Sequence, residues 1–130
     1  MSIPKEFFDM LPLPIVVVKN ISDSLNHPLV YVNIRFKQII GWDIEDIADK
    51  KSWWQKAYPD PYYQKAIENL WELKMDSIDP ENNSFVIMTV NIMTKHQGIR
   101  RFKVYTELDS VLMKGYYVVA FEELGTQILD

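Results

Sequence analysis

The chain of 130 residues contains no cysteine. This absence excludes disulfide bridges, thiolate nucleophiles, cysteine-ligated zinc and iron–sulfur clusters. It also fits a reducing compartment, so a cytoplasmic location is expected. Any chemistry the chain performs must come from other side chains.

Long apolar runs and clustered basic residues are scarce as well. No run reaches the about 18 apolar residues of a membrane-spanning helix, and the first residues lack the layout of a signal peptide. The 14 basic residues are outnumbered by 18 acidic ones, which gives a net charge of −4. Nucleic-acid and anionic-membrane surfaces need clustered lysine and arginine. We therefore expect no nucleic-acid partner and no membrane insertion.

What is present is an ordinary globular composition of 48% apolar, 13% aromatic and 25% charged residues. A length of 130 residues suits one domain with its own core. We expect residues 1–130 to form this single domain. In it, 1–12 would be a lead-in helix, 13–124 the core and 125–130 an exit segment toward an effector.

The first part of the chain predicts two short strands followed by a short capped helix. Residues 15–19 and 29–32 are rich in β-branched side chains and are separated by a polar loop. Asn33 can cap a helix over residues 33–40, and Gly41 stands where a left-handed residue commonly ends one. The apolar face of this helix consists of Phe36, Ile39 and Ile40.

Three more helices are expected before the strands resume. One over residues 44–49 would be capped by Asp43, and the next would begin at Ser52 with a capping box to Gln55. Asp60 followed by Pro61 is a strong start signal for the longest helix, which should reach about residue 77. Its expected apolar stripe is Tyr63, Ala66, Ile67, Leu70 and Trp71.

The remainder predicts three strands, at about 85–94, 99–108 and 115–122, after a loop over 76–84. The order β-β-α-α-α-α-β-β-β predicts an α+β fold with an antiparallel sheet of about five strands and a long helix packed on it. The strand over 85–93 is apolar on both faces, so its second face needs cover. Either the helix with Phe7, Phe8 and Met10 or a second copy of the chain could supply it.

Five motifs occur in an order that is specific in combination. The first has Asn33, Phe36, Gly41 and Trp42 in the pattern N-x-x-F followed by G-W. The others are Asp-Ile-Glu-Asp-Ile over 43–47, Trp-Trp-Gln-Lys-Ala-Tyr-Pro-Asp-Pro over 53–61, Lys-His-Gln-Gly over 95–98 and Tyr-Val-Val-Ala-Phe-Glu-Glu-Leu over 117–124. Together they resemble the PAS (sensory box) domain of bacterial histidine kinases and GGDEF-type signalling proteins, over about residues 10–124. One departure is the exit, Glu-Leu-Gly-Thr over 123–126, where the family has Asp-Ile-Thr.

Residues 33–38 read Asn-Ile-Arg-Phe-Lys-Gln, close to the N-C-R-F-L-Q motif of LOV-type PAS photoreceptors. Ile34 stands where that motif carries the cysteine that bonds the flavin. This stretch also follows the second strand, whereas the photoreceptor motif lies one or two helices later. The resemblance therefore implies no LOV-type flavin adduct. A thiol-linked chromophore of the photoactive-yellow type is excluded as well, because the chain has no cysteine.

The two histidines offer little for haem, metal or catalysis. His27 lies in a loop and His96 in a hairpin turn, whereas haem-binding PAS domains carry their histidine on or near the long helix. No carboxylate at metal-ligand spacing accompanies them. The sequence also lacks a catalytic triad, a phosphate-binding loop and a dinucleotide fingerprint. We expect no metal, no haem and no enzymatic activity.

The resemblance implies a small-molecule site between the long helix and the inner face of the sheet. The alternative is that the same large side chains fill the core, because close packing is the rule in interiors. Arg35 or Arg100 could anchor an anionic ligand unless both are exposed. The candidate lining residues are Trp54, Tyr63, Ile67, Leu70 and Trp71 from the helices and Phe102, Val104, Thr106, Val119 and Phe121 from the strands.

The sequence therefore predicts a sensory and signal-transduction module that binds a small ligand or dimerises. It would regulate an effector domain, of the histidine kinase or GGDEF type, in cis or in trans. The homodimer would form through the N-terminal helix and the outer face of the sheet. One alternative is a purely structural dimerisation domain. Another is a small cone-shaped isomerase- or dehydratase-like enzyme, which the strand-first order disfavours.

Overall fold

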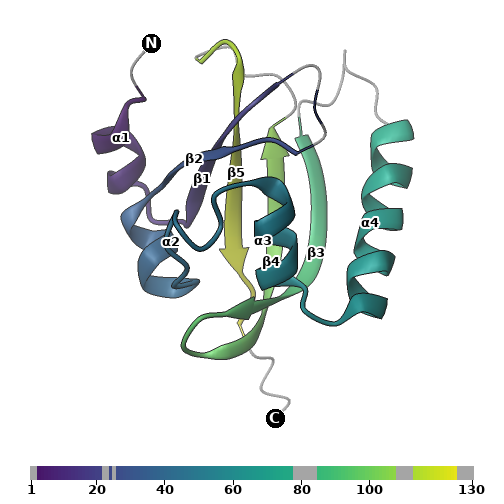
Figure 1. Ribbon diagram of the computed structural model, residues 1–130. Coiled ribbons are helices and arrows are strands. Elements are labelled where there is room, and N and C mark those ends of the chain that lie inside the picture. The colour runs from purple at the N-terminus through teal and green to yellow at the C-terminus, as the bar shows by residue number, and fades with distance from the viewer. Residues whose placement is uncertain (1–2, 22–23, 25, 78–84, 108–112, 126–130) are drawn as a thin grey trace.

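A computed structural model describes residues 3–21, 24, 26–77, 85–107 and 113–125 (Figure 1). Its centre is one five-stranded antiparallel sheet with the strand order β2-β1-β5-β4-β3. This confirms the α+β prediction. The strands are β1 (Ile15–Lys19), β2 (Leu29–Val32), β3 (Phe85–Thr94), β4 (Gly98–Glu107) and β5 (Tyr116–Glu123).

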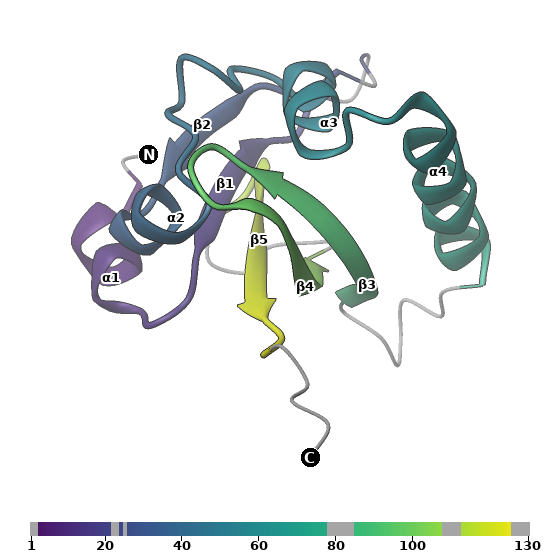
Figure 2. The same ribbon diagram turned by 90° about the horizontal axis from the view of Figure 1, so that it is seen from below.

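Four helices surround the sheet in the described residues: α1 (Lys5–Met10), α2 (Ile34–Ile39), α3 (Lys50–Ala57) and α4 (Pro61–Asp76). The last three lie between β2 and β3 in the chain and cover one face of the sheet, called here the inner face (Figure 2). The helix α1 contacts the opposite, outer face. The longest helix, α4, follows two strands and precedes three in the chain.

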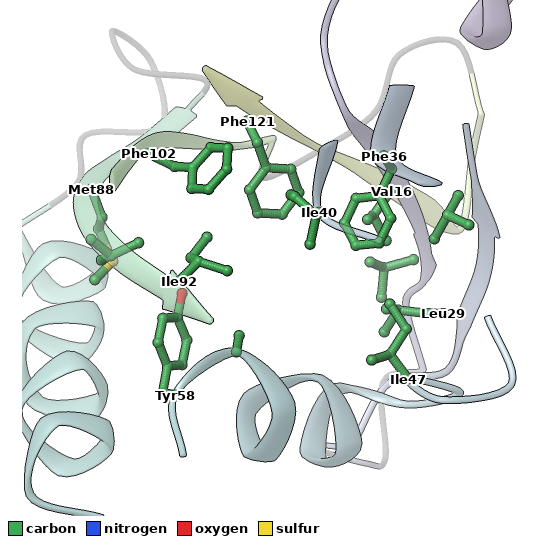
Figure 3. Packing of buried hydrophobic residues seen from close by; sticks show 14 of the residues in the cluster. Val16, Leu29, Phe36, Ile40, Ile47, Tyr58, Met88, Ile92, Phe102 and Phe121 are labelled. Carbon is green, nitrogen blue, oxygen red and sulfur yellow. The ribbon is translucent and has the colours of Figure 1, made fainter. Parts of the chain in front are cut away.

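Alternation along the strands divides the core into two clusters. The larger cluster joins α2, α3 and α4 to the inner face, with Phe36, Phe102 and Phe121 almost fully buried (Figure 3). The smaller cluster lies on the outer face, where Phe8 of α1 packs with Ile15 and Val17 of β1 and with Met113.

The expected helix signals at Asn33, Gly41 and Asp60 are confirmed. Asn33 Oδ1 accepts a hydrogen bond from the Phe36 N–H, and Asp60 accepts from the N–H groups at the start of α4. Gly41 has φ +91°, and a Cβ built there would approach the Lys95 Cβ to 3.0 Å. Glycine therefore satisfies both a left-handed backbone and a close approach of the β3–β4 hairpin.

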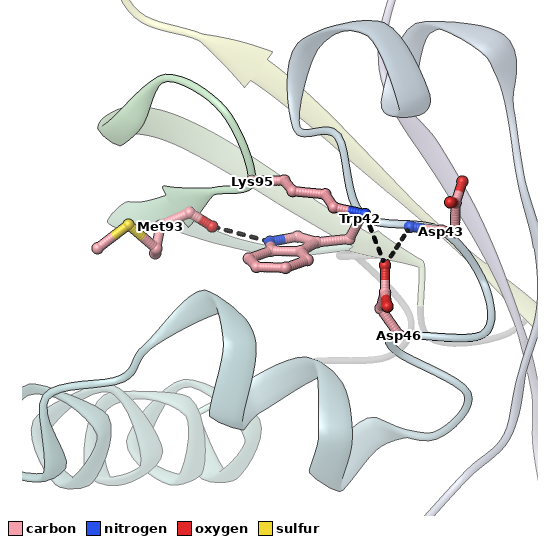
Figure 4. A network of polar contacts seen from close by, with 5 residues as sticks. All are labelled: Trp42, Asp43, Asp46, Met93 and Lys95. Atoms are coloured by element: carbon pink, nitrogen blue, oxygen red, sulfur yellow. Dashed lines mark hydrogen bonds and ion pairs between the residues drawn. The ribbon is translucent and has the colours of Figure 1, made fainter.

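The expected helix over residues 44–49 is wrong, because residues 44–47 form a turn. The Asp46 carboxylate accepts a hydrogen bond from the Asp43 N–H at 3.1 Å and contacts Lys95 Nζ at 3.4 Å (Figure 4). Trp42 Nε1 donates to the Met93 carbonyl in the same region. These bonds hold the backbone in a turn, since short acidic side chains compete with helical hydrogen bonding.

The expected start of the next helix at Ser52 is also wrong. Asp49 is the N-cap of α3, and its carboxylate accepts from the Ser52 N–H at 2.7 Å. The capping box to Gln55 therefore does not form, and α3 begins two residues earlier, at Lys50. The ends of the expected strand to residue 108, loop to residue 84 and exit segment to residue 130 lie outside the described residues.

Two expectations about apolar faces need correction. On α4, Ala66 is exposed and Trp71 is only partly buried, because the helix presents Ile67 as its one buried residue to the core. The helix α1 covers β1 rather than β3. The outer side chains Phe85 and Ile87 of β3 are therefore 50% and 40% exposed.

Candidate functional site

A partly open cavity of about 80 Å³ lies between α3, α4 and the inner face of the sheet. Its walls are apolar and aromatic, with few polar groups. From the sheet side they comprise Val16, Val18, Leu29, Met88, Val90, Val104, Thr106, Tyr117, Val119 and Phe121. From the helical side they comprise Lys50, Trp53, Trp54, Tyr58, Ile67 and Trp71.

The start of α3 determines which of its side chains reach the cavity. With Asp49 as the cap, Lys50, Trp53 and Trp54 stand at positions i, i+3 and i+4 and share one helix face. The turn after the helix then adds Tyr58, whose ring packs against Trp54 with the centroids 5.1 Å apart. In Figure 3 the Tyr58 hydroxyl points toward Ile92.

Seven of the ten residues expected to line a ligand site do line this cavity: Trp54, Ile67, Trp71, Val104, Thr106, Val119 and Phe121. The other three, Tyr63, Leu70 and Phe102, do not line the cavity and contact neighbouring residues instead. Tyr63 OH accepts a hydrogen bond from the Asn91 N–H of β3 at 2.8 Å. Phe102 is fully buried against Phe121, and Leu70 packs against the larger cluster. That the lining residues bind a ligand stays a prediction.

Sequence reasoning missed nine cavity residues, among them those of β1 and β3 and three with an ammonium or hydroxyl group, Lys50, Tyr58 and Tyr117. Strand alternation places Val16 and Val18 on the same face as Val119 and could have found them. Lys50 was missed because the sequence predicted that this helix begins at Ser52, two residues after Lys50. The residues missed are Val16, Val18, Leu29, Lys50, Trp53, Tyr58, Met88, Val90 and Tyr117.

Polar groups are sparse and unevenly placed around the cavity. Tyr117 OH and His27 Nδ1 are hydrogen-bonded at 2.9 Å, and burial raises the pKa of Tyr117 to about 12. Burial also raises the pKa of Tyr58, so both phenols stay neutral at physiological pH. Burial lowers the pKa of the Lys50 ammonium, whose Nζ lies 5.4 Å from the centre of the Trp71 ring.

A second, more open hollow of about 480 Å³ is lined by residues of α3 and α4 and by Asn26. Lys50, Trp54 and Trp71 line both this hollow and the inner cavity. These three side chains therefore form the boundary between solvent and the interior. A molecule that enters from this side must pass them.

The two arginines considered as anion anchors lie elsewhere. Arg35 donates to Gln38 on the exposed face of α2, and Arg100 pairs with Glu123 at 2.6 Å. Neither lines the cavity. Among the described residues, no three histidine or acidic side chains are grouped to hold a metal ion. In the same residues, no helix is long and apolar enough to span a bilayer.

The strand order, the helices between β2 and β3 and the position of the cavity define the PAS fold, of the kind found in LOV photoreceptors. The Rhodobacter sphaeroides LOV protein matches with a TM-score of 0.61 and 13% identity, over 95% of this chain and 66% of that one. The Erythrobacter litoralis blue-light activated histidine kinase matches with a TM-score of 0.60 and 17% identity, over 97% of this chain. An RNA-binding light-oxygen-voltage receptor matches with a TM-score of 0.59 and 13% identity, over 91% of this chain.

This chain spans 37% of the kinase and 31% of the RNA-binding receptor. No family model and no curated protein matches the sequence. The structural likeness therefore shows the fold, and activity has to be argued from the site.

The LOV likeness raises the question of whether the site fits a flavin. The sequence has no thiol to bond one, and Ile34 is 47% exposed on α2, outside the cavity. A cavity of about 150 Å³ is what accepts benzene. The cavity here has about 80 Å³, so the three fused rings of a flavin do not fit it. The absence of a flavin adduct stays a prediction.

Proposed function

We propose that this chain is a PAS-type sensory module that binds a small molecule between α3, α4 and the inner face of the sheet. The observation that carries the proposal is the cavity of about 80 Å³. It lies between the helices and the sheet, where the alternative prediction was a core filled by large side chains. Interiors pack closely, and an apolar space with a few convergent polar groups is the usual form of a ligand site.

The strand β5 links this site to the end of the chain. Val119 and Phe121 line the cavity, and β5 continues through Glu123 into residues 124–125. A ligand that spreads these side chains would shift β5 against its neighbours β1 and β4. In this way occupancy would bias the exit segment and an attached or separate effector. A histidine kinase or GGDEF-type enzyme is the effector expected.

The proposal is tested by native mass spectrometry and an absorption spectrum of the purified chain, alongside the variant Val104→Phe. The phenyl ring would fill part of the cavity without adding a polar group. We expect the wild type to carry a small-molecule mass that the variant loses. The proposal would be contradicted if the wild type and the variant had the same absorption spectrum and showed only the mass of the protein itself, both before and after incubation with a metabolite extract.

A homodimer through α1 and the outer sheet face is the second candidate role, and exposure favours it. Phe7 and Met10 of α1 are 48% and 74% exposed, and Phe85 and Ile87 are exposed on β3. The same face carries Lys103 and Glu122 opposite one another, so its charges suit a second copy of itself. Dimerisation and ligand binding are compatible, because they use opposite faces of the sheet.

A further inference from the structure

Lys50 is the one lining residue of the inner cavity, within the described chain, that carries a charge at neutral pH. It is the first residue of α3, and its side chain borders both the cavity and the outer hollow. The boundary position lets the ammonium reach a group at the cavity mouth. The aliphatic stem of the same side chain covers apolar surface.

The ammonium of Lys50 has no acidic partner in the described residues. Their two ion pairs join Lys95 to Asp46 and Arg100 to Glu123. The neighbour found for Lys50 Nζ is the face of the Trp71 ring, at 5.4 Å. A partly desolvated cation without a carboxylate is an unfavourable arrangement, which a bound anion would relieve.

The N-terminus of α3 does not compete for this anion. The Lys50 N–H donates to the His27 carbonyl, the Lys51 N–H to Asn26 Oδ1 and the Ser52 N–H to Asp49 Oδ1. With these donors occupied, the Lys50 side chain is the charge that the inner cavity offers to an anion, while Lys51, Glu68 and Glu72 line the outer hollow beside it. A single ammonium suits a monoanion better than a phosphate dianion, which needs several donors.

Beyond Lys50 the cavity is small and its lining is mainly apolar. Met88, Val90 and Val104 form the sheet wall, and Ile67 faces them from α4. Its volume of about 80 Å³ is about half that of a cavity that accepts benzene. A flexible alkyl chain can adapt to a small apolar space by rotating about its bonds, whereas an aromatic ring is rigid. The outer hollow, which shares Lys50, Trp54 and Trp71 with the cavity, leaves room for a polar head.

We propose that this site binds a short-chain aliphatic monocarboxylate, with its alkyl chain in the cavity and its carboxylate on the Lys50 ammonium. This inference rests on the ligand-binding function proposed above and adds the chemical class of the ligand. The carboxylate ties Lys50 of α3 to the ligand, while the chain contacts α4 and the sheet. Binding therefore connects all three walls of the site.

The test uses protein labelled with ¹³C on the methionine methyl groups. Met88 lines the cavity, and Met10, 74% exposed on α1, serves as an internal control. The probes are hexanoate, 1-hexanol and hexylammonium, which share a chain and differ in head group. The variant Lys50→Met removes the charge and keeps the stem. Lys51→Met is its matched control, because Lys51 lines only the outer hollow and not the inner cavity.

We expect hexanoate to shift the Met88 methyl signal with an affinity about tenfold or more above that of 1-hexanol, because a charged hydrogen bond adds that much. Lys50→Met should lose this advantage and keep 1-hexanol binding, which also shows that it is folded. Lys51→Met should behave as the wild type. Hexylammonium should bind most weakly.

Two other results are distinguishable. If 1-hexanol or hexylammonium binds as tightly as hexanoate, or Lys50→Met keeps the preference, the carboxylate inference is overturned and the ligand site stands. If none of the probes moves the Met88 signal relative to Met10, the cavity does not admit small molecules. That outcome overturns both this inference and the proposed function.

Discussion

At the scale of single residues, Asn33 joins three parts of the molecule. Its side chain is fully buried, and Oδ1 accepts from the N–H groups of Ile15 and Phe36 at 2.8 and 3.0 Å. Nδ2 donates to the carbonyls of Phe8 and Leu13 at 2.8 and 2.9 Å. The residue that the sequence identified as a helix cap therefore also ties β1 and α1 to α2.

Replacement of Asn33 by alanine should lower the free energy of unfolding by about 3 kcal/mol or more, because it leaves buried backbone groups without partners. Urea denaturation measures this change. The control is Asp60→Ala, an exposed cap of α4, which should cost about 1 kcal/mol. Equal costs for the two variants would show that Asn33 acts as a cap alone.

Among the three tyrosines whose pKa is raised in the folded chain, Tyr31 and Tyr117 predict a loss of stability at high pH. Burial and the hydrogen bond to Asp9 raise the pKa of Tyr31 to about 12, and burial raises that of Tyr117 to about 12. An unfolded tyrosine has a pKa near 10. Because folding favours the protonated phenols, their contribution is fully present below about pH 10 and is lost as pH rises through about 12.

The measurement is the midpoint of urea unfolding between pH 9 and 12. The wild type should lose stability over this range, and Tyr31→Phe and Tyr117→Phe should each flatten the decline. Tyr62→Phe, at a residue 88% exposed on α4, is the control and should leave the slope unchanged. If all three variants lose stability with pH at the same slope as the wild type, Tyr31 and Tyr117 do not cause the decline.

At the scale of elements, strands were easier to predict than helix starts. Alternation and β-branched residues predicted all five strands, because each strand face has a distinct environment. The start of α3 depended on whether Asp49 or Ser52 accepts the first backbone N–H, and both are good caps. With Asp49 as the cap, Lys50 is the first residue of α3 and borders the cavity, whereas the sequence placed it between two expected helices.

The contact between α4 and β3 was not predictable, since it joins residues far apart in the chain. β3 is an edge strand, and the Tyr63 hydroxyl of α4 accepts a hydrogen bond from its Asn91 N–H. Burial patterns indicate that Tyr63 faces the sheet but not which atom it meets. The bond occupies one donor of an edge that would otherwise be free to pair.

Tyr63→Phe should remove this bond and cost about 1 kcal/mol of stability. Amide hydrogen exchange is the direct readout, and the Asn91 amide should exchange faster in the variant than in the wild type. Tyr62→Phe on the same helix serves as the control. Unchanged protection at Asn91 in Tyr63→Phe would show that α4 does not cover this edge.

At the scale of the whole molecule, the two faces of the sheet have different roles in the proposal. The inner face carries the cavity, and the outer face carries exposed apolar side chains on α1 and β3. We expect a homodimer in solution that Ile87→Lys weakens by at least tenfold, because it places a charge in an apolar interface. Sedimentation velocity measures this, with Tyr62→Lys as the control. A monomeric wild type would contradict the dimer.

The central claim is that the space between α3, α4 and the sheet is a site rather than a filled core. Sequence reasoning left these alternatives open, because large side chains such as Trp54 and Tyr58 suit both. Packing density depends on how whole elements meet, which local patterns do not determine. The cavity is therefore the feature that an experiment should test without assuming the identity of any ligand.

Xenon under pressure provides that test, because it occupies apolar cavities whatever their natural ligand. In protein labelled on the methionine methyl groups, xenon should shift the signal of Met88 in the cavity and leave that of exposed Met10 nearly unchanged. Val104→Phe should abolish the shift. If xenon moves Met88 no more than Met10 in the wild type, the core is filled and the account of this protein as a ligand-binding module is wrong.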